Sequence, residues 1–266
     1  MGTDTLVRAA EGVDEGVDES VVDEGVAAAE AVRRRLAGLD WEALSAALDR
    51  DGYAVTPVPL VGEATAAEMR AGFDDDRLYR STVHMARLRY GDGVYRYFRA
   101  PLPPVVAALR EAAYPPLAIV ANRWAVRLRS RDRYPDRLSE LARRCRAVGQ
   151  TEPTPLVLRY GPGGWNALHQ DLYGEIAFPL QLAIPLSQAG RDYDGGENLL
   201  VEQRPRAQSR GTAITVPLGH GLVFPTRHRP VPGARGDQRV TVRHGVSTVR
   251  SGERYTLGII FHDARP

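Results

Sequence analysis

Residues 158–171 read LRYGPGGWNALHQD, and this segment decides how the rest of the chain is interpreted. An apolar run ends at Tyr160, a Gly-Pro-Gly-Gly turn follows, and a second run leads to His169 and Asp171. Residues two apart in a β-strand point to the same face of the sheet. The imidazole of His169 and the carboxylate of Asp171 can therefore bind one metal ion, although this spacing alone is a weak signal.

The character of the sequence changes near residue 154. Before it, the Ala- and Arg-rich segment 29–50 has leucines at helical spacing, and after it, short apolar runs alternate with glycine-rich turns. This order favours a mainly β fold with flanking helices (α+β), in which a jelly roll forms the core and N-terminal helices pack on one of its sheets. The expected helices are 29–50, 64–72, 104–113 and 134–148, a short strand begins at Gly52, and the core strands are 155–160, 176–186, 199–202, 212–217, 222–225, 240–244 and 254–262.

Composition divides the chain into three parts. Residues 1–28 repeat an acidic Gly-Val-Asp-Glu-like unit, which is typical of a disordered tail. We expect residues 29–153 to form a helical region that packs on the core, and residues 154–266 to form the catalytic β core. A chain of 266 residues is long enough for this arrangement.

The overall composition is that of a soluble globular protein, with 43% hydrophobic and 26% charged residues. No apolar run approaches the roughly 18 residues of a membrane span, and the N-terminus lacks the pattern of a secretory signal. The single cysteine, Cys145, cannot form an internal disulfide, which suits a reducing cytoplasm. We therefore predict a cytoplasmic protein without a membrane partner, and the oligomeric state stays open.

Positive charge is concentrated in one segment although the net charge is only +2. All 35 basic residues are arginines, and ten of them lie in residues 204–254 against only Asp237 and Glu253. Such a segment can bind an anionic substrate or a nucleic acid, and solvated strand faces explain it equally well.

Two further residues complete a candidate iron site. His244 lies at the end of a predicted strand, and Arg254 begins the next one. Two imidazoles and one carboxylate form the facial triad of non-haem Fe(II) oxygenases, which leaves positions open for a bidentate 2-oxo acid and for dioxygen. The planar guanidinium of Arg254 matches the distal carboxylate of such an acid. Thr256, on the same face as Arg254, and Tyr160 can add hydroxyl donors.

The sequence offers two alternatives to this metal site. His228 is also followed by an arginine, but Pro230 and Pro232 interrupt its strand, so we rank it below His244. Zinc also binds two histidines and a carboxylate. Zinc would leave the position of Arg254 unexplained.

Substrate contacts are expected close to the metal ligands. If the strand through His169 and Asp171 continues, Tyr173 and Glu175 face the cavity as well. A carboxylate there would bind an amine, a hydroxyl or a base N–H of the substrate. The alternative is that Glu175 pairs with a surface arginine.

Segment 158–171 resembles the metal segment of AlkB-type and prolyl-hydroxylase-type dioxygenases. Longer stretches resemble a bacterial group of 2OG-Fe(II) oxygenases, described as AlkB-like enzymes acting on damaged DNA. This resemblance runs from about Gly52 to the C-terminus. It implies a cupin-like double-stranded β-helix, with Fe(II) on the two histidines and Asp171 and 2-oxoglutarate bound by Arg254. The stretches are YRYFRAPLPP, ANRW, GQTEPTPLVLRYG, HQDLYGEIAFPLQLAIPLS, DYDGGEN, VEQRPRAQSRG and VRHGVSTVRSGERYTLGIIFHDA.

The chain departs from this group at Asn198, where an apolar residue usually follows Gly-Glu. Asn198 is therefore a third candidate for contact with the substrate. The retained Asp171 disfavours halogenation, because related halogenases have a small residue at that position.

Three functions follow from the resemblance and the composition. The first is oxidation of a C–H bond of a small-molecule substrate, with release of succinate and CO2, favoured by the modest net charge. The alternative is AlkB-like oxidative demethylation of a nucleobase, nucleotide or damaged DNA, favoured by the arginines. The third is a metal-bound module without turnover. Tyr95, Tyr97, Phe98 and Trp124 can stack on a base, and buried aromatic core is the more common explanation for such residues.

Overall fold

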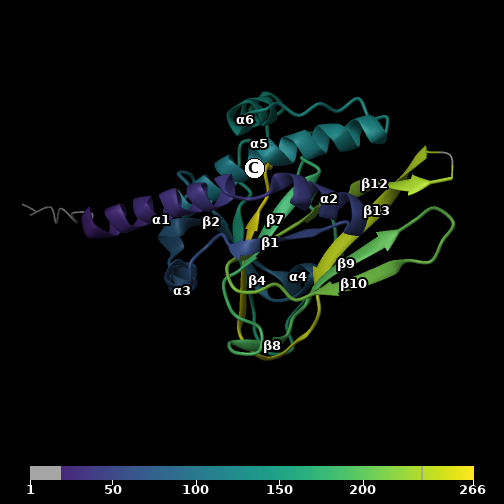
Figure 1. Cartoon of the computed structure of the whole chain (residues 1–266). Coiled ribbons are helices and arrows are strands. Elements are labelled where there is room, and N and C mark those ends of the chain that lie inside the picture. Colours follow the sequence, from purple (N-terminus) through teal and green to yellow (C-terminus); the bar gives the residue numbers. More distant parts are fainter. Residues whose placement is uncertain (1–18, 235) are drawn as a thin grey trace, which may run out of the picture.

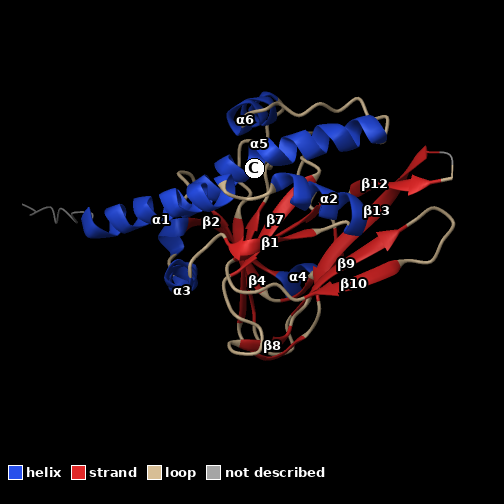
Figure 2. Cartoon of the chain, in the orientation of Figure 1, coloured by secondary structure: helices blue, strands red, loops and turns tan. Residues whose placement is uncertain are grey.

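The computed structural model describes residues 19–234 and 236–266. Its largest element is a seven-stranded sheet of order β1-β11-β7-β15-β5-β4-β2, in which every neighbouring pair is antiparallel (Figure 2). The strands are β1 (Ala54–Pro59), β2 (Tyr79–His84), β4 (Val94–Phe98), β5 (Leu156–Tyr160), β7 (Leu180–Pro185), β11 (His220–Pro225) and β15 (Arg254–Ile259).

A second sheet, of order β10-β9-β13-β6-β3 with β12 paired to β13, faces the first. Leu200 and Val242 of this sheet pack against Leu222 and Phe224 of the main sheet, so the two sheets share one core. The predicted jelly-roll architecture with mainly β structure is confirmed. The strands are β3 (Gly91–Asp92), β6 (Trp165–His169), β9 (Asn198–Gln203), β10 (Arg210–Ile214), β12 (His228–Gly233) and β13 (Gly236–Val246), and β8 (Tyr193–Gly195) pairs with β14 (Val249–Gly252) in a separate ribbon.

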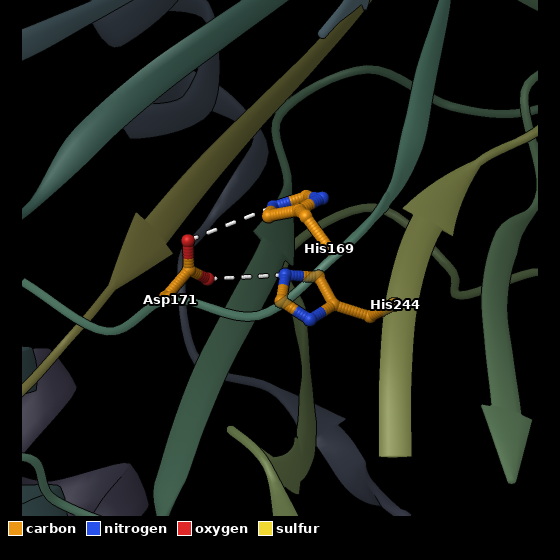
Figure 3. Close-up of side chains that lie close together, drawn as sticks. All are labelled: His169, Asp171 and His244. Carbon is orange, nitrogen blue, oxygen red and sulfur yellow. Dashed lines mark ion pairs between the residues drawn. The ribbon is translucent and has the colours of Figure 1, made fainter. Parts of the chain in front are cut away.

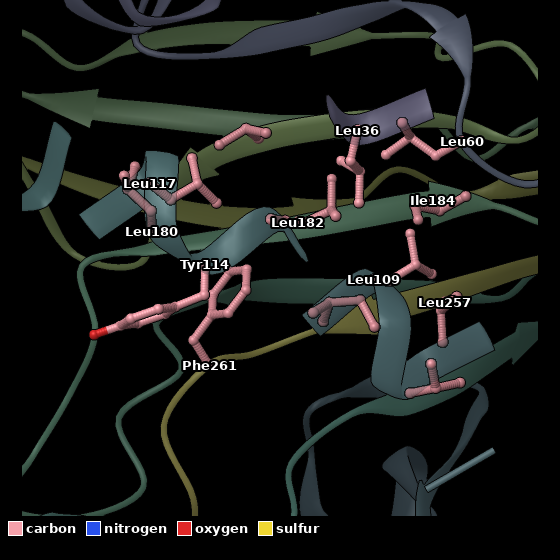
Figure 4. Packing of buried hydrophobic residues seen from close by; sticks show 14 of the residues in the cluster. Leu36, Leu60, Leu109, Tyr114, Leu117, Leu180, Leu182, Ile184, Leu257 and Phe261 are labelled. Atoms are coloured by element: carbon pink, nitrogen blue, oxygen red, sulfur yellow. The ribbon is translucent and has the colours of Figure 1, made fainter. Parts of the chain in front are cut away.

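Helices cover the outer face of the main sheet (Figure 1). Leu36 of α1 and Leu109 of α5 pack with Leu182 of β7 and Leu257 of β15 (Figure 4). Each buried leucine contributes roughly 1.5–3 kcal/mol, so this contact fixes the helices on the sheet. The helices are α1 (Glu19–Ala37), α2 (Trp41–Asp51), α3 (Glu63–Ala71), α4 (Met85–Leu88), α5 (Pro104–Arg127) and α6 (Leu138–Ala147), with short 3-10 turns at Gly72–Asp74 and Asp76–Leu78.

Helix α1 corrects the expected extent of the acidic tail. It begins at Glu19, so residues 19–28 of the predicted disordered segment are helical, and residues 1–18 lie outside the described residues. Alanines favour a helix here, and Ala29 is buried against the core. Tertiary packing therefore outweighs the polar composition of this segment.

Two predicted helices have different lengths in the structure. Helix α5 continues past residue 113 and through Pro115 and Pro116, because the buried Tyr114 and Leu117 anchor it to the core on both sides of the prolines. The helix expected from residue 134 begins only at Leu138. The side chain of Asn122 bonds both backbone groups of Tyr134 and holds this residue in a loop.

Strands of the N-terminal region change the expected domain boundary: β1 matches the strand expected from Gly52, whereas β2 and β4 were not predicted. Strands β1, β2 and β4 come from residues 29–153 and lie in the same sheet as β5, so position 153/154 does not separate two structural units. Strand β12 contains Pro230 and Pro232, which were expected to prevent a strand. It pairs only with β13, and proline is tolerated on such an edge.

Candidate active site

The structure brings His169, Asp171 and His244 together (Figure 3). His169 and His244 are paired across β6 and β13. The Nε2 atoms of His244 and His169 lie 3.0 and 3.6 Å from the two carboxylate oxygens of Asp171. One candidate ligand atom from each residue lies within 4.8 Å of the others. Side chains from two strands and the following turn thus form a candidate metal site.

A bulge in β6 orients His169 toward this site. Asn166 pairs with Val246 and His169 with His244, so β6 has one residue more than β13 between these pairs. The extra residue puts Asn166 and His169 on the same inner face, where both line one cavity. The ring Nδ1 of His169 lies 2.7 Å from the carbonyl oxygen of Ala167, which leaves Nε2 for the metal.

The protonation states suit metal binding. Burial and the neighbouring His244 lower the pKa of His169, so its imidazole is neutral, as a ligand must be. Burial alone would raise the pKa of Asp171, but the two imidazoles and the hydroxyl of Tyr173 outweigh it and lower this pKa. The Tyr173 hydroxyl donates to Oδ1 of Asp171 at 2.6 Å and fixes the carboxylate.

An inner cavity of about 620 Å³ extends from the candidate metal site to Arg254. Arg254 is only 1% exposed and donates to Oδ1 of Asn198 at 2.8 Å. Among the described residues, its Nε, the Thr256 hydroxyl and the Gln181 amide nitrogen are buried without a hydrogen-bond partner. Leaving a buried donor unpaired costs about 1–3 kcal/mol, so these donors indicate a site for an anionic ligand.

Tyr160 lines the same inner cavity and is fully buried. Burial raises the pKa of Tyr160 to about 12, so the hydroxyl keeps its proton. Asn166 donates to the Tyr160 oxygen at 3.1 Å, which leaves the phenolic proton to donate elsewhere. The structure therefore brings Tyr160, Thr256 and Arg254 together, as their sequence positions suggested.

A second cavity, of about 880 Å³, adjoins the metal site and also contacts His169 and Asp171. We call it the tyrosine cavity, because four tyrosines line it. The ring of Tyr97 makes edge contacts with those of Tyr95 at 5.4 Å and Tyr173 at 6.2 Å. The tyrosines are Tyr90, Tyr95, Tyr97 and Tyr173.

The three residues expected to contact the substrate lie in different places in the structure. Tyr173 lines the tyrosine cavity, whereas Glu175 is exposed and lines none of the cavities described here. Strand β6 ends at His169, so the alternation assumed for Glu175 does not continue. Asn198 lies in the inner cavity together with the candidate metal ligands, and its Oδ1 accepts a hydrogen bond from Arg254.

Other residues were placed differently or missed. His228 begins β12 and lies outside the metal cluster. Tyr95 and Tyr97 line a cavity, but Phe98 and Trp124, the other aromatic residues considered for stacking, are buried in the core. Gln181 was missed; its signal is a lone amide within an apolar strand.

Comparisons with known proteins place this chain in a family. Residues 93–264 match the model of an oxygenase family described as catalysing oxidative methylation of damaged DNA. Two uncharacterized proteins, from two strains of Mycobacterium tuberculosis, are each 56% identical over 167 residues, which is 63% of this chain and 72% of theirs. The chain belongs to this oxygenase family and is an oxidoreductase.

Solved structures share the fold. A prolyl-4-hydroxylase from Pseudomonas putida aligns over 85% of this chain and 100% of its own, with 16% identity and a TM-score of 0.51. The non-haem α-ketoglutarate-dependent epimerase SnoN of nogalamycin biosynthesis gives 16% identity and a TM-score of 0.51 over 85% of each chain. Family, fold and candidate metal site are together those of an Fe(II)- and 2-oxoglutarate-dependent oxygenase, as predicted. None of the described helices is both long and apolar enough to span a membrane.

Proposed function

We propose that this oxygenase oxidises a C–H bond of a small molecule whose flat, uncharged group occupies the tyrosine cavity. One observation carries the proposal. The cluster of His169, Asp171 and His244 lies where two cavities of different chemistry meet, one ending at a buried arginine and the other lined by tyrosines. Cosubstrate and substrate would therefore approach the same metal from different sides.

The residues present fit Fe(II). Two imidazoles and one carboxylate favour this ion and leave coordination positions open. Bound Fe(II) would supply, with 2-oxoglutarate and dioxygen, the oxidising power for C–H cleavage, while 2-oxoglutarate becomes succinate and CO2. Tyr173 holds the Asp171 carboxylate and Ala167 holds the His169 ring, so this chain fixes its ligands before the metal arrives.

The inner cavity fits 2-oxoglutarate. The guanidinium of Arg254 would bind the distal carboxylate, with Thr256 and Tyr160 as hydroxyl donors and Gln181 as an amide donor. Support comes from their burial and from the three donor atoms that have no partner among the described residues. A charge-assisted contact in such a dry site is roughly twice as strong as a neutral one.

The tyrosine cavity favours a planar substrate group. Apart from Asp171, which would hold the metal, its lining contains no charged side chain. Ring contacts contribute about 0.5–1.5 kcal/mol each beyond the burial of their area. A flat apolar or aromatic group therefore gains more in this cavity than a charged aliphatic one.

Oxidative demethylation of a nucleobase is the second candidate function. The edge-packed tyrosines and the family description favour it, because every base offers a flat face for stacking. Hydroxylation of an N-methyl carbon yields a hemiaminal that releases formaldehyde. The arginines of residues 204–254 support it less than their number suggested, since Arg229 and Arg254 are buried and hydrogen-bonded.

Succinate release separates these functions. The iron-loaded full chain would be given aromatic metabolites, methylated nucleosides and methylated single-stranded DNA in parallel. Release above the substrate-free level with an aromatic metabolite supports our proposal, and release only with a methylated nucleoside or with methylated DNA supports the second candidate. If no planar compound raised succinate release while aliphatic compounds did, the assignment of the tyrosine cavity would be wrong. The His169→Ala variant is the control without metal-dependent turnover.

A further inference from the structure

A third cavity lies between the C-terminal half of α5 and the start of β12. Its volume is about 850 Å³. We call it the basic cavity and define it by Trp124, Leu172, Arg227, His228 and Arg239. His228 thus lines a cavity other than the one that holds the candidate metal site.

The two arginines of this cavity have free hydrogen-bonding capacity. Within residues 19–234 and 236–266, neither Arg227 nor Arg239 forms an ion pair or a side-chain hydrogen bond. The neighbouring Arg229 and Arg127 are paired, with Glu202 and with Asp237 respectively. Unpaired guanidinium groups that share a cavity form a place where an anion gains two charge-assisted contacts.

His228 belongs to the same group of donors. Its Nδ1 is buried and has no partner among the described residues. Burial lowers the pKa of His228, and the positive charges of Arg227 and Arg239, which line the same cavity, lower it further. A bound anion would satisfy the ring nitrogen and both arginines at once.

The basic cavity adjoins the tyrosine cavity. Leu172 lines both, and it directly follows the candidate metal ligand Asp171. His228 is paired with Thr241 on β13, three residues before His244. Three residues of extended strand span roughly 10 Å, so one small molecule can reach from one cavity to the other.

We infer that the basic cavity binds a phosphate monoester group on the substrate whose oxidised part occupies the tyrosine cavity. Binding of the phosphate group does not depend on turnover. Only the statement that this group belongs to the oxidised substrate rests on the proposed function. Two guanidinium forks and an imidazole match the oxygens of a compact dianion. Asp132, held by the Ser130 hydroxyl at 2.5 Å, also lines the cavity and limits the charge it can accept.

Calorimetric titration of the full chain with inorganic phosphate tests the binding half. We expect Arg227→Gln and Arg239→Gln each to weaken binding about tenfold or more. Asp132→Asn should tighten it, because a repelling carboxylate is removed. Arg243→Gln is the matched control, since Arg243 is an exposed arginine on the same strand as Arg239 and lines none of these cavities. Equal binding by all four variants would overturn the inference.

Succinate release by the iron-loaded enzyme tests the substrate half. A nucleoside monophosphate, its nucleoside and a short single-stranded oligonucleotide would be compared, all carrying the same methylated base. We expect the monophosphate to be preferred over the nucleoside at least tenfold, and Arg227→Gln to abolish this preference. Preference for the oligonucleotide, lost in the same variant, would assign the cavity to a nucleic-acid backbone and overturn the monoester. Phosphate binding without oxidation of any of these compounds would leave the anion site standing and exclude methylated bases as the substrate, and the screen of aromatic metabolites described above would then decide whether the proposed function fails.

Discussion

Arg254 donates a hydrogen bond to Oδ1 of Asn198, and the amide nitrogen of Asn198 donates in turn to the carbonyl oxygen of Ile214. The first contact joins β15 of the main sheet to β9 of the second sheet. Because both ends of the Asn198 amide are bonded, Asn198 fixes the orientation of the guanidinium at the wall of the inner cavity. Asn198 is therefore a positioning residue for Arg254.

Replacing Arg254 with Leu should raise the KM for 2-oxoglutarate about a hundredfold or more, because one partner of a buried charge pair is worth about 3–5 kcal/mol. Asn198→Ala should raise it less, about tenfold, with little change in kcat. Substrate-free decarboxylation of 2-oxoglutarate measures both. Fe(II) affinity is the control and should stay unchanged. An Arg254→Leu enzyme with the original KM would show that the cosubstrate binds elsewhere.

Metal binding should depend on three residues. His169→Ala, Asp171→Ala and His244→Ala should each lose stoichiometric Fe(II) and all turnover, because removing one of three ligands leaves an incomplete triad. His228→Ala should keep its Fe(II) and the substrate-free decarboxylation of 2-oxoglutarate, since His228 lies in the basic cavity. Metal content by elemental analysis, with circular dichroism to verify folding, checks this. Loss of iron in His228→Ala with iron retained in His244→Ala would reverse the assignment.

Replacing Tyr90 tests the tyrosine cavity without disturbing the packing of the core, because Tyr90 lines this cavity and is half exposed. Tyr90→Ala should lower substrate-dependent succinate release several-fold, in line with about 1 kcal/mol for a lost ring contact. Substrate-free decarboxylation should not change. The control is Glu175→Gln, an exposed change beside the site that should alter neither activity. A parallel loss of both activities in Tyr90→Ala would indicate a structural role.

His262 should make the protein less stable in acid. Burial lowers its pKa to about 4, and its Nδ1 accepts a hydrogen bond from the backbone of Phe178. In the unfolded chain, His262 takes up a proton as the pH falls below about 6.5. In the folded chain, the same imidazole takes up a proton only near pH 4. The free energy of unfolding is therefore highest above pH 6.5 and falls by about 3 kcal/mol as the pH decreases through this window. Urea unfolding at a series of pH values measures it.

The matched control for this pH effect is His84→Gln, because His84 is exposed. This variant should keep the full slope of unfolding free energy against pH, whereas His262→Asn should lose most of it. The comparison uses slopes, so a lower absolute stability of His262→Asn does not obscure the result. The same slope in His262→Asn would assign the acid sensitivity to another group.

Truncation separates the two parts of the predicted tail. Deleting residues 1–18 should leave the melting temperature nearly unchanged, since their composition offers few large apolar groups. Deleting residues 1–37 removes α1 with the buried Val32 and Leu36, and should lower it by ten degrees or more. Differential scanning calorimetry measures both. A large drop after the shorter deletion would show that residues 1–18 take part in the fold.

The residues of the site that could be predicted are those that the spacing of nearby residues in the sequence indicates. His169 and Asp171 stand two residues apart, and His244 and Arg254 mark the ends of apolar strands. Tyr90 could not be placed in the same way, because it reaches the cavity through the pairing of β3 with β6, a contact between distant segments.

The limits of prediction for the fold have the same cause. The breadth of the main sheet depends on β2 and β4, whose polar and aromatic residues resemble a loop until they pair with each other and with β5. The predicted helix 104–113 ended before Pro115 and Pro116, and Pro230 and Pro232 were expected to interrupt β12, but buried neighbours and an edge position accommodate these prolines. Tertiary contacts that sequence spacing does not contain decide all three cases.

The bulge in β6 has an evolutionary consequence. Asn166 and His169 share a face only because one residue more separates them than separates their partners on β13. Losing a single codon between them would restore regular pairing and leave the two residues two apart in the strand, so the His169 imidazole would still face the cavity. A descendant with that deletion would keep both cavities and all three candidate metal ligands, so in this lineage the length of the chain at this point can change without loss of the metal site.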